Sequence, residues 1–243
     1  MRCASGVLAT LLGSLLLLCF LSQPATAGIT FYDGTFDLNN YGPAQIWSSD
    51  PSVVTSIQQI TSGGNPGDAL QINLTFQAGT YDSWQGLIHN SWSYNPLIQG
   101  ALTSITFSED KLVHTDGDFQ LQGSNIRALI LQGGSYYVAL VPVDPILEQW
   151  VSGSGTLLAT DFGLLDFSSG TTDFSKHPNF SGGEMDFGLA NEFGVELNGQ
   201  VDFSIEYDNL MYALNQQSTP EPSSILLLGS AMIGAGAWRR RRG

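Results

Sequence analysis

Two acidic residues are the best candidates for catalysis in this sequence. Glu184 and Asp186 lie two residues apart in a strand-like segment, and side chains at that spacing point to the same face of a sheet. Retaining glycoside hydrolysis requires a nucleophile and an acid, both positioned carboxylates. The positions after Phe187 hold Gly188 and Leu189 rather than a further acid, so a proton donor is missing. Ordinary strand alternation is therefore the favoured interpretation.

Other catalytic and metal-binding patterns are incomplete. His89, His114 and His177 are single histidines without the paired spacing of a zinc site. Residues 161–163 spell Asp-Phe-Gly, but no Gly-rich nucleotide loop accompanies them, and no G-x-S-x-G nucleophile motif is present. The sequence contains no complete catalytic constellation, and we expect a noncatalytic protein.

Aromatic side chains are the candidate ligand-binding residues, because an exposed ring can stack on a sugar. Trp84 and Trp92 lie in strand-like segments, and we expect them in the core. Trp150 and Tyr94 are expected to be more exposed, and they are the predicted ligand-binding residues.

The charge of the chain is concentrated unevenly. The 243 residues include 8 Lys+Arg and 22 Asp+Glu, a net charge of −14. Five of the bases and one acid lie in the two end segments, so the middle carries −18, and both cysteines, Cys3 and Cys19, also lie in an end segment. Such a body has no basic patch for nucleic acid and no thiol for disulfides. It is compatible with neutral glycans or divalent ions.

The N-terminal segment has the pattern of a secretory signal peptide. Arg2 precedes the apolar run Val7–Leu21, and small residues occupy positions 25–27. We predict a signal peptide at 1–27. An uncleaved anchor is the alternative, but the 15-residue run is shorter than the roughly 20 residues that span a bilayer.

The middle of the chain has the pattern of short strands. Residues 69–76, 101–107 and 201–207 alternate apolar and polar side chains, and residues 126–131 and 136–141 flank a Gly-Gly turn. Gly-rich segments such as 153–155 are predicted loops. We therefore predict an all-β, antiparallel sandwich of jelly-roll type at 28–214, followed by a linker at 215–219.

The C-terminal 24 residues combine a stiff tripeptide, an apolar run and a basic end. The run Ile225–Trp238 covers about 21 Å as a helix, and we predict one transmembrane helix at about 223–238, with the basic end cytoplasmic. The flanking residues are Pro220, Glu221 and Pro222 before it, and Arg239, Arg240, Arg241 and Arg242 after it.

This segment, 220–243, resembles the PEP-CTERM sorting signal of Gram-negative bacteria. The resemblance implies that an exosortase recognises and cuts near the tripeptide, after transient membrane anchoring. The protein would then reach the cell envelope or an extracellular exopolysaccharide matrix. An ordinary C-terminal membrane anchor with a basic stop-transfer sequence is the alternative.

Segments 31–37 with 63–67, 177–188 and 206–210 resemble β-sandwich domains similar to carbohydrate-binding modules and concanavalin-like lectins. Such sandwiches hold structural Ca²⁺ where the first and last strands approach, and the matching acids are Asp33, Asp208 and Asp37. Residues 184–187 look like the acidic strand of laminarinase-type glycosidases, without its third acid.

Two functional hypotheses follow. The first is a noncatalytic envelope or matrix protein whose sandwich adheres to polysaccharide or protein. The second is a carbohydrate-active enzyme, a glycoside hydrolase, on the same sandwich.

Overall fold

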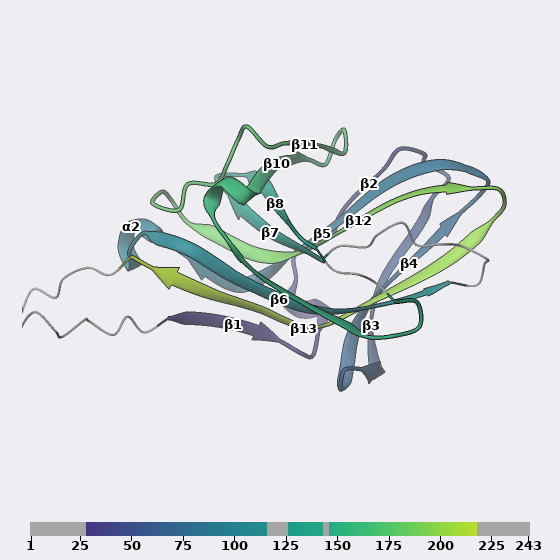
Figure 1. Ribbon diagram of the computed structural model, residues 1–243, viewed down its shortest axis with the longest axis horizontal. Helices are drawn as coiled ribbons and strands as arrows, with labels where there is room; N and C mark the ends of the chain where they lie inside the picture. The colour runs from purple at the N-terminus through teal and green to yellow at the C-terminus, as the bar shows by residue number, and fades with distance from the viewer. Residues whose placement is uncertain (1–27, 116–125, 143–145, 218–243) are drawn as a thin grey trace, which may run out of the picture. The chain divides into compact units, whose positions relative to one another are not determined.

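Two antiparallel sheets face each other across one apolar core in this computed structural model, which describes residues 28–115, 126–142 and 146–217 (Figure 1). The arrangement confirms the expected all-β sandwich of jelly-roll type. The expected signal peptide at 1–27, the apolar helix at about 223–238, and the Pro and Arg residues that flank that helix lie outside the described residues.

The first sheet has six strands in the order β3-β4-β13-β6-β9, with β1 paired to β13. Alternation of the kind predicted at 69–76 is visible in β4, where every second side chain is buried from Leu70 to Phe76. The strands are β1 (Ile29–Asp33), β3 (Val54–Gly64), β4 (Gly67–Phe76), β6 (Leu102–Thr115), β9 (Val151–Leu157) and β13 (Val201–Gln216).

The second sheet has seven strands in the order β11-β10-β8-β7-β12-β5-β2. The predicted hairpin is confirmed: β7 and β8 pair through a turn in which Gly133 and Gly134 have φ of 59° and 79°, values that glycine adopts without strain. The strands are β2 (Gln45–Ser48), β5 (Gly79–Tyr94), β7 (Ile126–Gln132), β8 (Ser135–Val141), β10 (Phe162–Asp166), β11 (Thr171–Asp173) and β12 (Met185–Leu197).

Helical structure in the described residues is short. It consists of α2 (Pro96–Gln99) and two 3-10 turns, η1 (Leu38–Asn40) and η2 (Ala159–Asp161). None of these described helices has the length and apolar character needed to cross a membrane.

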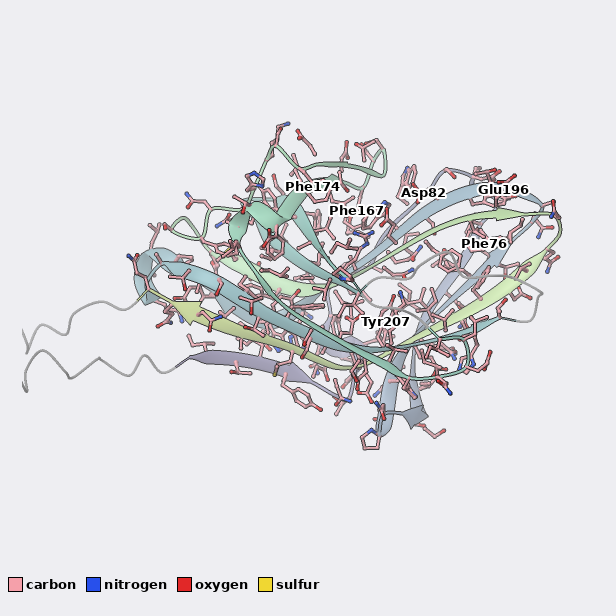
Figure 2. The ribbon with its side chains drawn as sticks, viewed as in Figure 1. Phe76, Asp82, Phe167, Phe174, Glu196 and Tyr207 are labelled. Carbon is pink, nitrogen blue, oxygen red and sulfur yellow. The ribbon has the colours of Figure 1, made fainter. Side chains whose placement is uncertain are left out.

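Aromatic side chains fill the space between the sheets. The Phe76 ring lies 5.5 Å from Phe193 and 5.8 Å from Phe203 (Figure 2). The Tyr212 hydroxyl crosses the core from β13, donates to the Gly188 carbonyl at 2.5 Å and accepts from the Leu129 N–H at 2.9 Å. These contacts fix the two sheets against each other.

Charged groups are also buried between the sheets. Neither carboxylate oxygen of Glu109 has a hydrogen-bond partner among the described residues. Burial raises the pKa of Glu109 well above its usual value, an effect that the charge of Lys111 partly offsets. Burial lowers the pKa of Lys111 to about 8. Because the folded-state pKa of Glu109 exceeds the unfolded value, its contribution to stability falls as pH rises through that folded-state pKa.

Two boundaries differ from those expected. Residues 153–155, a predicted loop, lie inside β9, where the two glycines lack side chains and Gly155 packs directly against Val141 of the other sheet. The final strand runs past the expected end of the sandwich at 214, because Asn215 and Gln216 pair with Ser104 and Leu102 of β6.

Candidate functional site

The two aromatic side chains predicted to bind a ligand lie in different settings. The expectation that Tyr94 is exposed is wrong. It is fully buried at the end of β5, where its hydroxyl donates to the Gly100 carbonyl at 2.6 Å across the turn that contains α2. Trp150 is partly exposed directly before β9, and it lines neither of the two pockets described below.

The three predicted calcium ligands are engaged in other contacts. The Asp33 carboxylate accepts hydrogen bonds from two backbone N–H groups and two hydroxyls. These bonds outweigh burial and lower the pKa of Asp33. Asp208 accepts from the backbone N–H groups of Asn65 and Asn209, whereas Asp37 caps η1 at the surface.

Asp33, Asp37 and Asp208 therefore do not form the calcium-binding cluster that was predicted. Among residues 28–115, 126–142 and 146–217, no group of three His, Cys, Asp or Glu side chains could hold a metal ion. Calcium binding stays a prediction. Calorimetric titration of chelator-treated protein tests it, and the absence of both heat and a change in melting temperature would contradict it.

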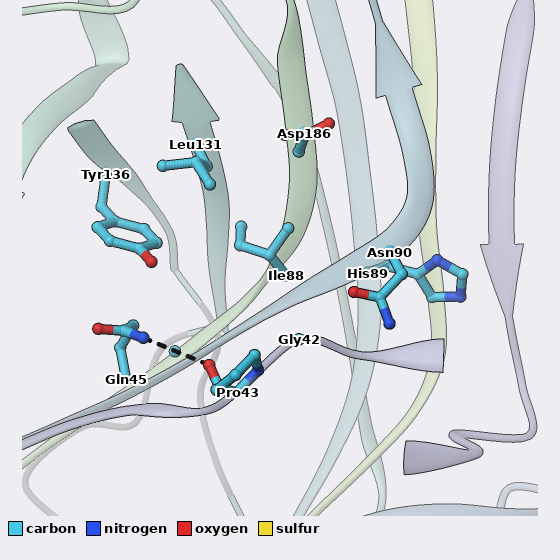
Figure 3. A pocket seen from close by; sticks show the side chains of 10 residues that line it. Gly42, Pro43, Gln45, Ile88, His89, Asn90, Leu131, Tyr136 and Asp186 are labelled. Atoms are coloured by element: carbon cyan, nitrogen blue, oxygen red, sulfur yellow. Dashed lines mark hydrogen bonds between the residues drawn. The ribbon is translucent and has the colours of Figure 1, made fainter. Parts of the chain in front are cut away.

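The candidate ligand site is a pocket of about 280 Å³ on the outer face of the seven-stranded sheet (Figure 3). One wall is aromatic, one edge carries amides, and a carboxylate lies at the far end. The lining residues are Gly42, Pro43, Gln45, Gly86, Ile88, His89, Asn90, Leu131, Tyr136 and Asp186.

Strand order brings these residues together from five segments of the chain. In the registers, Tyr136 lies opposite Leu131, Leu131 lies opposite Asp186, and Gln45 lies opposite Gly86. The pocket floor thus runs across β8, β7, β12, β5 and β2. Figure 3 shows the His89 ring pointing away from the pocket, on the other side of β5 from Ile88, as alternation requires.

A β-bulge positions the carboxylate of the pocket. The register of β12 with β5 shifts between Asp186 and Gly188, and bulges commonly re-aim side chains beside functional sites. Burial raises the pKa of Asp186, a hydrogen bond to Ser93 lowers it, and the charge of Glu184 raises it further. The Ser93 hydroxyl donates to Glu184 at 2.5 Å, and Ser93 lies opposite Asp186 in the register. The two acids that were weighed as catalytic candidates therefore lie beside one serine.

An apolar cluster continues the pocket floor along the same face. Its buried members are Trp84, Leu129, Val138, Leu165 and Ala190, with Trp47, Ile88, Tyr136 and Phe167 packed against them. A Cβ on Gly86 would lie 2.5 Å from the Phe167 ring, so the close approach of that ring needs glycine. Phe167, which Figure 2 labels, meets Tyr136 edge-on, with the ring centres 5.1 Å apart. This contact holds the Tyr136 ring at the pocket wall.

A partly buried ion pair borders the cluster. The Arg127 guanidinium pairs with Glu192 and lies 5.0 Å from the centre of the Trp84 ring. Burial lowers the pKa of Arg127 to about 10, and the charges of Tyr207 and Asp82 offset part of this effect by raising the pKa. The pair stiffens the side of the face away from Asp186.

A second pocket, of about 530 Å³, lies against the six-stranded sheet. Its phenyl ring, on Phe203, is buried, so the pocket offers polar groups and an imidazole but no exposed Phe, Tyr or Trp ring for stacking. The lining residues are Asn73, Leu74, Thr75, His114, Thr115, Glu148, Asp202, Phe203 and Ser204. We therefore take the pocket beside Tyr136 as the candidate site.

Sequence reasoning did not find Tyr136, Gln45 or Asn90. One signal was present in the sequence. Tyr136 and Tyr137 are consecutive in a predicted strand, and since side chains alternate between the two faces of a strand, one of the two rings must face outward. The neighbours of that outward ring depend on the order of the strands, which no local pattern encodes.

Comparison with known proteins identifies the C-terminal segment. The family model of the PEP-CTERM protein-sorting motif matches residues 218–242. The match confirms the sorting signal predicted there, and this motif implies export and exosortase sorting to the envelope of a Gram-negative bacterium. No curated protein matches the chain.

Solved structures similar to this chain include three carbohydrate-binding modules. The family 11 module of the Clostridium thermocellum cellulase Lic26A-Cel5E is 15% identical, with a TM-score of 0.40 over 81% of this chain and 99% of the module. The CBM22-1 xylan-binding domain of Paenibacillus barcinonensis Xyn10C is 12% identical, with a TM-score of 0.37 over 79% and 99%. The family 30 module of Clostridium thermocellum Cel9D-Cel44B is 12% identical, with a TM-score of 0.38 over 79% and 99%.

Proposed function

We propose that this chain is an exported, noncatalytic envelope or matrix protein whose sandwich binds polysaccharide in the pocket beside Tyr136. The observation that carries the proposal is the composition of this pocket. It joins a held aromatic ring, two amides and a carboxylate on one open sheet face.

Each group suits a sugar ring. The Tyr136 face can pack on the apolar C–H face of a pyranose. Gln45 and Asn90 offer both donors and acceptors, and Asp186 offers acceptors, which together match pairs of neighbouring hydroxyls. A few placed polar groups around an apolar wall are typical of ligand sites.

The acidic body favours an uncharged ligand. The middle of the chain carries a net charge of −18, which repels polyanions and leaves neutral glycans unaffected. The sorting signal at 218–242 supports a destination where polysaccharide is present.

A glycan array with the wild type, Tyr136→Ala and Tyr32→Ala tests the proposal. Tyr32 is the matched control, because its ring is 60% exposed on β1 of the other sheet. We expect the wild type and Tyr32→Ala to bind the same glycans and Tyr136→Ala to lose at least tenfold in affinity, about 1.4 kcal/mol. A wild type that binds no glycan, or equal binding by Tyr136→Ala, would overturn it.

Glycoside hydrolysis is the second candidate, favoured by the meeting of Glu184 and Asp186 at Ser93. In such an enzyme one of the two carboxylates would be the nucleophile and the other the proton donor, which the local sequence pattern did not supply. Release of reducing sugar from a bound glycan, abolished in both Glu184→Gln and Asp186→Asn, would support an enzyme. A glycan that stays intact in the presence of wild type would exclude hydrolysis of that glycan.

A further inference from the structure

The turn around α2 presents two apolar side chains to solvent. Leu97 and Ile98 are 73% and 81% exposed, more than any other large hydrophobic side chain in the described residues. The turn is held in place, because Asn95 caps the helix through the Leu97 N–H and Tyr94 binds the Gly100 carbonyl. The exposed pair is therefore a fixed tip.

This tip lies where the chain leaves the sandwich. Leu102, which follows the turn, pairs with Gln216 at the end of β13, and the Thr103 hydroxyl donates to the Asn215 carbonyl at 3.0 Å. Figure 1 shows α2 beside the end of β13. Eight residues, 217–224, separate that strand from the apolar run Ile225–Trp238, and they reach about 28 Å at most.

The same end of the six-stranded sheet is free of charge. Residues 28–32, 94–108 and 209–217 contain no Asp, Glu, Lys, Arg or His, in a chain whose middle carries −18. The registers place these segments side by side, because Leu214 lies opposite both Ile29 and Ile105. On the other sheet, the carboxylates of Glu184 and Asp186 lie beside Ser93, just before the turn.

We propose that Leu97 and Ile98 dock into the surface of the lipid bilayer while the C-terminal apolar run is inserted in it. The proposal rests on the proposed function as an exported, sorted protein, and on the transient membrane anchoring that the sequence analysis expects of its C-terminal segment. Exposed apolar side chains that are brought to a bilayer surface partition into the interface between headgroups and acyl chains. An uncharged rim loses no hydration of charged groups on approach. Docking would hold the segment around Pro220–Pro222 at the membrane surface.

Site-specific fluorescence on the full chain in phosphatidylcholine–phosphatidylethanolamine vesicles tests the proposal. With Cys3→Ser and Cys19→Ser, a single added cysteine is the only thiol. The label, nitrobenzoxadiazole, is placed through Ile98→Cys at the tip, or Leu97→Cys as a repeat. Gly234→Cys lies within the apolar run. Asn198→Cys is the control, at the far end of β12, about 40 Å from Met185, which pairs with Tyr94.

We expect lipids brominated in their acyl chains to quench the label at 98 and at 234 and to shift its emission to shorter wavelength, with no change at 198. Quenching at 234 with position 98 behaving like 198 would overturn docking and leave the anchored stage standing. No quenching at any of these positions would contradict the anchored stage as well.

Discussion

The outer faces of the two sheets differ in how their side chains are satisfied. On the six-stranded sheet, polar side chains bond to one another across strands: Gln58 donates to Gln71, and Gln71 donates to Glu206. On the seven-stranded sheet, the corresponding face carries the apolar cluster and the pocket beside Tyr136. A face that satisfies its own polar groups offers little to a ligand. The difference supports the proposal that the seven-stranded sheet carries the ligand site.

The largest expected difference between the two faces is the loss in the free energy of unfolding when one central side chain on each face is truncated. Trp84→Ala removes a buried ring under Arg127 and Phe167, and we expect it to lower the free energy of unfolding by about 3–5 kcal/mol. Gln71→Ala removes only surface hydrogen bonds and should cost about 1 kcal/mol. Urea unfolding measures both. Equal losses would show that the two faces do not differ in this way.

Ion pairs on the two faces give a smaller contrast. Glu192→Gln leaves the largely buried Arg127 guanidinium without its charged partner, and we expect a loss of about 1.5 kcal/mol. Glu148→Gln breaks the exposed contact with His114 and should cost less than about 1 kcal/mol. In concentrated salt the Glu148 effect should vanish and the Glu192 effect should persist. The reverse salt dependence would contradict the assignment of burial.

The smallest effect concerns the pocket carboxylate. The pKa of Asp186 is raised in the folded state, so the folded protein binds more protons than the unfolded chain above pH 3.8, and stability falls as pH rises through that window. Asp186→Asn should therefore stabilise the protein at pH 7, by less than about 0.5 kcal/mol, and not at pH 3. Thermal unfolding at both values measures the difference. The prediction would be contradicted if Asp186→Asn lowered the stability at pH 7, or if it raised the stability more at pH 3 than at pH 7, each compared with wild type at the same pH.

Local patterns predicted the strands well, because alternation reports which side of a sheet is buried. The period-2 segments became β4, β6 and β13, and the Gly-Gly turn became the β7–β8 hairpin. The pattern failed at residues 153–155, where glycines signal a loop but serve close packing against Val141. Trp84 and Trp92 are both buried, as expected, but only Trp92 lies in the core between the sheets, whereas Trp84 lies in the apolar cluster on the outer face.

The site was less predictable, for two physical reasons. Tyr94 was expected at the surface, but the turn that follows its strand folds back, and the Gly100 carbonyl of that turn accepts a hydrogen bond from the Tyr94 hydroxyl. Gln45, Ile88, Tyr136 and Asp186 come from four strands, and only the order of those strands makes them neighbours. The sorting signal was predictable, since all of its parts are contiguous in sequence.

Chemical-shift mapping of the ¹⁵N-labelled protein, titrated with a glycan that the array identifies, tests the central claim most directly. We predict the largest amide shifts at Ile88, Leu131, Tyr136 and Asp186, which line the pocket on the seven-stranded sheet. The largest shifts at Asn73, His114 and Ser204, which line the pocket on the six-stranded sheet, would contradict it.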